Sequence, residues 1–485
     1  MQTVLPAEDI FFHSFALQDG TPCAVCYADG MVNKQLLGDL IARPLEKLVL
    51  SENEEGRGAL KSSSNGDEAK KKVRNALLFP EVKEETSLKN AVTELLDGNA
   101  VVFVGDLPLA FIVGTKLLPI RTITEPPTDV AVKGPREGFI EDIKTNMVLL
   151  RKRLKTPSLR LKTSRIGKQS ETMVCLCYLD GTADEGLLKQ IEERLQSVDL
   201  DCVPDSSYIT EILAERKHSV FRSVGTTERP DVFAAKLSEG RVGVLVDGSP
   251  IALTLPFLQV EDFQSNEDYY VSPAMATIFR TLRIVSVIVA LLLPAFYLSS
   301  QLFKIQLLPL GLTLTIVEST SRLPLSPSME TFVVLFVLEV LKEASIRMPK
   351  YVGMSLSVVG ALVLGEAAVS AGLLSTPTII VVAFSGICLY TVPNFVETGS
   401  ILRWAFLIVA GSIGPFGIVL LAAFVLYYLI TADHFGTPPL APFSPMLPRD
   451  LKDGAVKYDL FSLQKRPRFL NSKNKTRLKR KEKQQ

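Results

Sequence analysis

The stretch IVSVIVALLLPAFYLSSQLF (Ile284–Phe303) decides the fold of this chain, because it is uncharged, mostly apolar and long enough to cross a bilayer. The hydrocarbon core of a membrane is about 30 Å thick and takes roughly 20 apolar residues in a helix. Three further stretches meet this test fully or nearly so, namely Tyr351–Leu373, Thr376–Pro393 and Trp404–Ile430. An all-α, polytopic membrane domain is therefore predicted for residues 272–435.

Charge placement predicts the orientation of this domain. Arg280 and Arg283 precede the first predicted span, and the tail Lys465–Gln485 is strongly basic although the whole chain carries a net charge of only +1. Lys and Arg near span ends favour the cytoplasmic side, so both termini are expected to be cytoplasmic. That arrangement needs an even number of spans. Four are expected, since six would require the short apolar segments Ile305–Val317 and Thr331–Leu341 to cross as well.

The region before the membrane domain contains an internal repeat. CAVCYADG (Cys23–Gly30) corresponds to VCLCYLDG (Val174–Gly181), and each is typical of a buried strand that ends in an Asp-Gly turn. Residues 91–113 and 233–255 then repeat a pattern of helix, glycine, strand, turn and strand. An α/β region of two related subdomains is therefore predicted to precede the membrane domain.

The boundaries follow from composition. A Pro-rich turn near residue 125 separates the predicted subdomains, 1–125 and 126–271. The first contains a polar segment, 51–72, with the composition of a flexible loop. A basic cytoplasmic tail is predicted for 436–485. The start of the chain has no basic segment followed by an apolar core, so no signal peptide is expected.

No catalytic, metal or cofactor constellation is recognisable. GTADEG (Gly181–Gly186) begins like a phosphate loop, but two leucines follow where Lys and Ser or Thr are required. Cys23 and Cys26 have no second Cys/His pair at metal spacing, so they are interpreted as small apolar strand residues. The chain is expected not to be an enzyme and to need no cofactor. A membrane-tethered enzyme is the least favoured alternative.

One candidate functional residue is Glu366, near the middle of the predicted span Tyr351–Leu373. A carboxylate at membrane depth is costly, so it usually faces a bundle interior or a water-filled path. The small neighbours Gly365 and Ala367 permit close approach of another helix. Glu366 is therefore a candidate for an ion pathway, and a hydrogen bond that glues two helices is the structural alternative.

Two more candidates, Glu339 and Glu343, are four residues apart and share one face of an amphipathic helix. If several subunits surround an axis, this face becomes a ring of acids, which is a basis for cation selectivity. An interfacial helix whose acids pair with Lys342 and Arg347 remains an equal alternative.

A series of motifs extends from the second subdomain to the tail. They are GPREGF (Gly134–Phe139), RKRLKTPSL (Arg151–Leu159), TTERPDV (Thr226–Val232), VDGSP (Val246–Pro250), EDYY (Glu267–Tyr270) and LAPFSP (Leu440–Pro445). In these motifs the chain resembles the A-subunit family of bacterial spore germinant receptors, the GerA type, which includes stage V sporulation protein AF. The resemblance covers roughly residues 33–445.

The resemblance implies an integral protein of the spore inner membrane. Its implied partners are a transporter-like B subunit, a lipoprotein C subunit, further copies of itself and membrane lipids, with no nucleic acid. It also implies assembly into a ring-shaped cation channel that releases ions when a nutrient binds. A secondary transporter with a cytosolic regulatory domain is the alternative, although such proteins usually repeat their membrane halves. The nutrient and the subunit number stay open, as does the choice between a receptor subunit and the sporulation-protein relative.

Six residues match signature positions of the family and are expected to pack subdomains or to contact a subunit. They are Gly134, Arg136, Glu137, Thr227, Glu228 and Arg229. Ion pairs of these arginines with the glutamates of a neighbouring subunit are one possibility.

Overall fold

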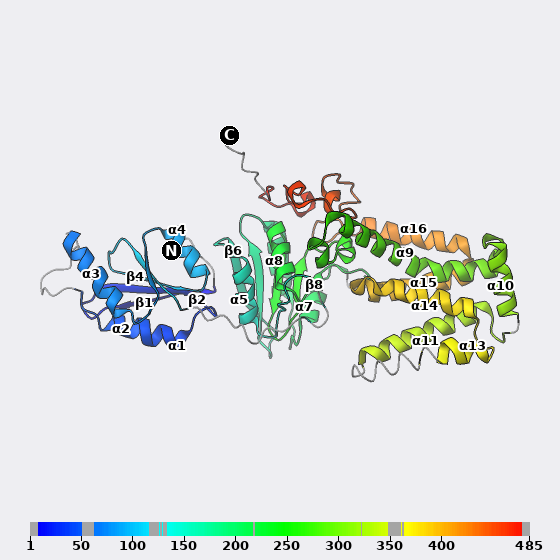
Figure 1. The fold of residues 1–485 in the computed structure, drawn as a ribbon, viewed down its shortest axis with the longest axis horizontal. Helices are drawn as coiled ribbons and strands as arrows, with labels where there is room; N and C mark the ends of the chain where they lie inside the picture. Colours follow the sequence, from blue (N-terminus) through cyan, green and yellow to red (C-terminus); the bar gives the residue numbers. More distant parts are fainter. Residues whose placement is uncertain are drawn as a thin grey trace.

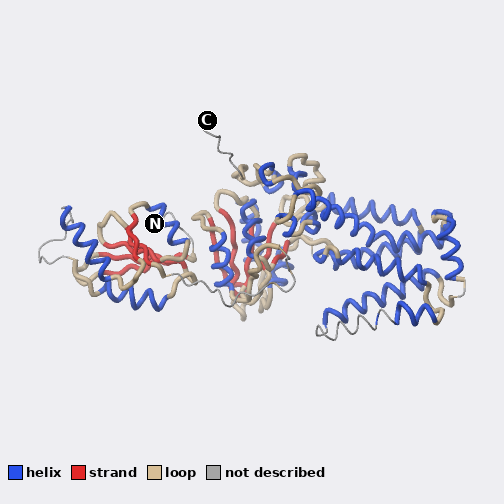
Figure 2. The backbone as a smooth tube through the Cα atoms, in the orientation of Figure 1, coloured by secondary structure: helices blue, strands red, loops and turns tan. Residues whose placement is uncertain are grey.

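The computed structural model describes residues 8–50, 63–115, 126, 129, 133–216, 219–321, 323–347, 360 and 363–477. Figure 1 shows an elongated molecule with three parts in a row, which are an N-terminal α/β unit, a second α/β unit and a bundle of helices. The C-terminal segment folds back along the second unit. Strands occur in the two α/β units and the far part is helical (Figure 2), so the predicted fold class is confirmed.

The first unit is built on an antiparallel sheet with the strand order β1-β2-β4-β5-β3. Its strands are β1 (Ile10–Ala16), β2 (Pro22–Ala28), β3 (Val82–Glu85), β4 (Ala100–Val104) and β5 (Ala110–Val113). Its helices are α1 (Lys34–Leu37), a π-helical turn (Gly38–Ala42), α2 (Arg43–Glu46), α3 (Ser63–Ala76) and α4 (Leu88–Leu96).

The second unit repeats this topology with the strand order β6-β7-β9-β10-β8. Its strands are β6 (Leu159–Ile166), β7 (Thr172–Leu179), β8 (Gly225–Thr227), β9 (Val242–Val246) and β10 (Ala252–Leu255). Its helices are α5 (Ile143–Arg153), α6 (Glu185–Ser197), α7 (Ser206–Leu213) and α8 (Pro230–Glu239). The predicted pair of related subdomains is confirmed by the matching strand orders. The predicted boundary at residue 125 lies outside the described residues.

The cysteines in the strands β2 and β7 are core residues. In β7, Cys175 and Cys177 face α5 and α8, while Val174 and Leu176 face α6 and α7. This alternation is expected of a strand covered on both faces. Burial raises the pKa of Cys23 and of Cys26 in β2 to about 12. These thiols therefore stay protonated near neutral pH.

The prediction of a flexible loop over residues 51–72 is wrong for its last part, because residues 63–72 belong to α3. Ala69, Val73 and Leu77 recur every four residues and are all buried, with Val73 and Leu77 in the core of the first unit. This apolar stripe stabilises a helix in spite of the polar composition of the segment. Residues 51–62 lie outside the described residues.

The helical bundle follows two short 3₁₀ turns, Gln259–Phe263 and Asn266–Tyr269. Its helices are α9 (Pro273–Phe303), α10 (Leu310–Thr320), α11 (Pro327–Arg347), α13 (Ala368–Ser370), α14 (Thr376–Tyr390), α15 (Val396–Ile413) and α16 (Pro415–Thr431). A π-helical turn, Val363–Ala367, leads into α13. Within the described part, two helical segments are long and apolar enough to cross a membrane, Pro273–Phe303 and Pro393–Ile413.

The predicted span Trp404–Ile430 is wrong as a single span, because the chain turns back at Gly414. This glycine has φ +76°, and Pro415 starts the next helix. At the other end of the hairpin, the Thr398 hydroxyl donates to the Val220 carbonyl, and the Arg216 guanidinium donates to the Thr431 carbonyl. Since both contacts reach one loop of the second unit, α15 and α16 run away from that unit and return to it.

The segment Thr331–Leu341, too short to count as a crossing in the sequence, lies inside the longer helix α11. Glu330 contacts Ser375 at the far end of the bundle, and Lys342 contacts Ser400 near the α/β end. The helix therefore runs the length of the bundle beside α14 (Figure 2). With α11 along the length of the bundle and α15 and α16 as a hairpin, the arrangement of the helices differs from the four single spans expected from the sequence. The other short apolar segment, Ile305–Val317, falls mostly in α10, which lies across the far end (Figure 1). Residues 351–359, 361 and 362 of the predicted span Tyr351–Leu373 lie outside the described residues.

The C-terminal segment is not an independent tail. Phe435 is buried in the core of the second unit between α6, α7 and the sheet, where Arg194 stacks 4.4 Å from its ring centre. Ala441 packs with Leu258 and Val260, and the Arg466 guanidinium donates to the Ser238 carbonyl. The second unit is thus completed by residues from the end of the chain.

Candidate functional site

Three sequence motifs that are far apart along the chain meet at the edge of the second unit. Arg229 is buried just before α8, and it donates to the Asp231 carboxylate at 3.0 and 3.1 Å and to the Pro135 carbonyl at 2.8 Å. The Asn266 amide and the Tyr270 hydroxyl also donate to Asp231. Burial alone would raise the pKa of Asp231, but the hydrogen bonds from Arg229 and Asn266 hold it below its usual range. The cluster joins the Pro135 loop and α8 to the turn before the bundle.

Gly134 lies beside this cluster and needs to be glycine. Its φ is +115°, and a Cβ atom there would lie 2.7 Å from the Tyr270 ring. A side chain at this position would therefore meet both backbone strain and a steric clash.

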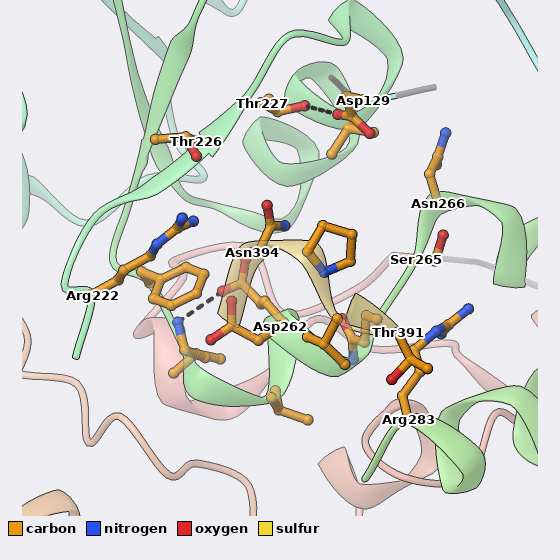
Figure 3. A pocket seen from close by; sticks show the side chains of 18 of the residues that line it. Asp129, Arg222, Thr226, Thr227, Asp262, Ser265, Asn266, Arg283, Thr391 and Asn394 are labelled. Atoms are coloured by element: carbon orange, nitrogen blue, oxygen red, sulfur yellow. Dashed lines mark hydrogen bonds between the residues drawn. The ribbon is translucent and has the colours of Figure 1, made fainter. Parts of the chain in front are cut away.

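The remaining signature residues also make contacts within the chain. Glu137 accepts hydrogen bonds from Lys152 at 2.6 Å and Arg153 at 2.8 Å, both in the last turn of α5. The Thr227 hydroxyl donates to Asp129 (Figure 3). The Glu228 carbonyl accepts from the Phe139 amide, and Arg136 is exposed nearby. The suggested pairs with a neighbouring subunit are not needed for Arg229 or Glu137, because each has partners in its own chain.

A second cluster fixes the start of α9 to the α/β region. Arg280 and Asp268 are both completely buried, and Arg280 also donates to the Asp453 carboxylate and the Gly454 carbonyl in the C-terminal segment. Arg283 adds a second ion pair to Asp268. From the sequence alone, Arg280 and Arg283 were expected only to orient the membrane domain. The EDYY motif, which contains Asp268, was the available hint of a structural role.

A cleft of about 2470 Å³ separates the second unit from the near ends of the bundle helices. Figure 3 shows Arg222, Asp262 and Asn394 together in it, with Arg283 and Thr391 further along. Asp262 is 8% exposed, and its Oδ1 has no hydrogen-bond partner among the described residues. Burial raises the pKa of Asp262 to about 7, partly offset by the nearby Arg222. This carboxyl therefore titrates near neutral pH.

Inside the bundle, Glu339 belongs to a buried ion network. Arg403 of α15 is 1% exposed, and its guanidinium donates to Glu339 and, at 3.2 Å, to the Ser385 hydroxyl. Lys342 pairs with Glu339 as well and donates to Ser400 at 2.9 Å. Arg403 was missed in the sequence, where it stands directly before the predicted span Trp404–Ile430.

The other two predicted acids lie on the surface of the bundle. Glu343 is exposed and pairs with Arg347 of the next turn at 2.6 Å. Glu366 is exposed beside Gly365 and Ala367, in the π-helical turn before α13. The structure thus does not bring the three acids together. A fourth carboxylate that the sequence analysis missed, Glu330, is 1% exposed at the far end of the bundle.

Comparison with known proteins gives consistent matches. Residues 2–469 match the family model described as Bacillus/Clostridium GerA spore germination protein. Spore germination protein KA of Bacillus subtilis (strain 168) is 32% identical over 95% of this chain and 83% of its own length. Spore germination protein GerLA of Bacillus cereus is 30% identical over 94% of this chain and 91% of its own. The N-terminal domain of the A subunit of the Bacillus megaterium spore germinant receptor GerK3 aligns at 24% identity and a TM-score of 0.39, over 53% of this chain and 92% of that domain.

Proposed function

This chain belongs to the Bacillus/Clostridium GerA spore germination protein family as a germinant-receptor A subunit, and we propose that several copies of it form a cation-conducting membrane channel that opens during germination. We further propose a transporter-like B subunit and a lipoprotein C subunit as its partners. The proposed location is the spore inner membrane, with both termini in the cytoplasm.

The observation that carries the channel proposal is the exposure of Glu366 on a largely apolar bundle surface. Apolar side chains such as Ile380, Ile387, Phe416 and Val419 are largely exposed on the bundle surface. An ionised carboxylate on such a surface is costly in lipid. Association of several copies around an axis would move it from lipid into a water-filled path, where acids select cations.

The two α/β units support the proposal as an assembly platform. Arg151 is buried in α5 and pairs with Asp9 of the first unit at 2.6 Å. Arg280 and Asp268 then join the second unit to α9. Buried, hydrogen-bonded pairs of this kind define one relative arrangement of the parts, so movement of the units would be transmitted to the bundle.

The test uses the purified full-length protein in liposomes loaded with K⁺ or Na⁺. Cation flux through an oligomer is expected, and Glu366→Gln is expected to change the ratio of K⁺ to Na⁺ permeation. Glu211→Gln, which removes an exposed acid on α7 of the second unit, outside the bundle, serves as the matched control. A strictly monomeric protein that passes neither ion would refute the channel. Unchanged permeation in Glu339→Gln, Glu343→Gln and Glu366→Gln would remove these residues from the pathway.

A further inference from the structure

The cleft between the second unit and the bundle continues into the bundle as a groove between α11 and α14. Figures 1 and 2 show that these two helices diverge toward the α/β end, although Glu330 and Ser375 hold them together at the far end. Side chains of both helices line the same cavity as Arg222 and Asp262. The cavity of about 2470 Å³ therefore has one part outside the bundle and one part within it.

The walls of this groove are apolar. On each helix the lining positions recur every three or four residues, so they share one helical face. They are Val334, Leu338 and Leu341 on α11 and Ile379, Ala383 and Ile387 on α14. Gly386 lies between the last two, and an added Cβ there would lie 3.2 Å from the Leu338 side chain. Ile387 is 65% exposed. An open apolar surface of this kind is typical of a site for an apolar partner.

The mouth of the groove carries an excess of positive charge. Lys342 lines the cavity on the same face of α11 and is half-buried. Lys342 and Arg403 both pair with Glu339, so these three side chains have a net charge of +1. Glu343, which also lines the cavity, is already paired with Arg347. An anionic group at the mouth would therefore be stabilised.

The mouth also lies at the depth expected for lipid headgroups. Helix α11 has 21 residues and is about 31 Å long, close to the roughly 30 Å of the hydrocarbon core. Lys342 lies in its last two turns, and long charged side chains near helix ends reach the headgroup layer. Tyr390, the last residue of α14, lines the cavity and is exposed. Tyrosine is enriched at the same level of a membrane.

We propose that this groove holds an acyl chain of one membrane phospholipid whose phosphate lies at Lys342. The chain covers the apolar walls, and the phosphate compensates the excess positive charge. Basic pockets between helices bind lipid headgroups in other membrane proteins. The site rests on the proposed membrane location, but it does not depend on cation conduction.

The experiment is native mass spectrometry of the full-length protein in detergent with added phosphatidylglycerol, which counts the lipids retained per chain. One lipid per chain should remain at a detergent concentration that removes all others. Diacylglycerol with the same acyl chains lacks the phosphate and should be retained on the order of tenfold less well, because the charged hydrogen bond to Lys342 is lost.

Two pairs of variants test the two ends of the site. Ala383→Phe fills the groove and should abolish retention, whereas Ile380→Phe adds a ring at an exposed position of α14 outside the lining and should not. Lys342→Gln should remove the preference for phosphatidylglycerol over diacylglycerol. Arg347→Gln, which changes an exposed cation of the same helix, should keep that preference. The Lys342 pair decides the question if Ala383→Phe does not fold.

Retention of one lipid by Ala383→Phe with a wild-type melting temperature would overturn the site. Equal retention of phosphatidylglycerol and diacylglycerol by the wild type would also overturn it. A smaller oligomer of Ala383→Phe with an unchanged lipid count would show that a second copy covers the groove instead. Lipid retention without cation flux would refute only the channel, and flux without lipid retention would refute only this site.

Discussion

Arg280 and Asp268 form an ion pair of 3.0 Å in which neither side chain has any exposed surface, at the point where the second α/β unit meets the bundle. Arg283 and the C-terminal Asp453 complete the cluster. Three segments of the chain therefore depend on one buried group of charges.

Asp268→Asn should destabilise the protein strongly, because it leaves Arg280 with one charged partner fewer in a buried site. Breaking a buried pair typically costs about 3–5 kcal/mol. Thermal unfolding of the detergent-solubilised protein measures the effect. Arg347→Gln removes the exposed pair with Glu343, which is worth about 0–1 kcal/mol, and is the control. Equal melting temperatures for the two variants would contradict the assignment.

Gly134→Ala should cost more than a substitution at another glycine with positive φ. Both Gly134 and Gly181 have positive φ, but only at Gly134 would the new Cβ meet a neighbour, the Tyr270 ring at 2.7 Å. Gly181→Ala therefore measures the backbone strain alone, about 1–3 kcal/mol, and the difference between the variants measures the clash. If both variants unfold at the same temperature, Tyr270 gives way and the contact is not required.

Glu339→Gln and Glu343→Gln should differ although the residues are one helical turn apart. The first leaves Arg403 buried without its carboxylate, which costs about 3–5 kcal/mol. The second removes an exposed pair and should change the free energy of unfolding by less than about 1 kcal/mol. A double-mutant cycle of Glu339 and Arg403 should give a coupling of about 0.5–3 kcal/mol. Additive effects would show that the pair does not form.

Asp262 should make the stability depend on pH between its ordinary pKa of 3.8 and its raised pKa of about 7. In this window the folded protein keeps the proton and the unfolded chain loses it, so the free energy of unfolding falls as pH rises. The slope is at most about 1.4 kcal/mol per pH unit and vanishes above pH 7. The free energy of unfolding is therefore compared between the wild type and Asp262→Asn at each pH. The difference isolates the contribution of this carboxyl from those of Arg222, Glu261 and Lys236, which interact with it.

The control for this experiment is Asp201→Asn, which changes an exposed aspartate of the same unit. Its stability should run parallel to that of the wild type at every pH. A parallel curve for Asp262→Asn as well would show that Asp262 has an ordinary pKa.

Cysteine labelling should follow burial in the α/β units. Cys202 is exposed, whereas Cys23, Cys26, Cys175 and Cys177 are buried. The thiolate is the reactive form, so a maleimide reagent should modify Cys202 first in the native protein near neutral pH. Mass spectrometry of digested samples identifies the labelled site. Rapid labelling of Cys23 or Cys26 would contradict the core position of β2.

The duplication could be predicted because strand, turn and helix patterns are local and recur at constant spacing. Cys23–Gly30 and Val174–Gly181 do form equivalent strands, β2 and β7, in sheets of the same order. The helix α3 was missed because composition outweighed a stripe of three buried residues. In general, local periodicity was more informative than average polarity.

The break at Gly414 and the buried charges were harder to predict. Glycine and proline are tolerated inside membrane helices, so an apolar run does not reveal where it folds back. Arg403 and Glu330 have their partners elsewhere in the bundle, Glu339 on α11 and Ser375 directly before α14. Such partners depend on how helices pack, and the sequence of one helix does not contain that information.

The insertion of Phe435 into the second unit has a consequence for how the protein is made. A ribosome synthesises the strands and helices of this unit first, then every helix of the bundle, and only afterwards Phe435 and the segment around it. The core of the second unit therefore stays incomplete until the bundle has been translated and α16 has returned to the same side. Final closure of the second unit reports that the preceding helices have reached their correct arrangement.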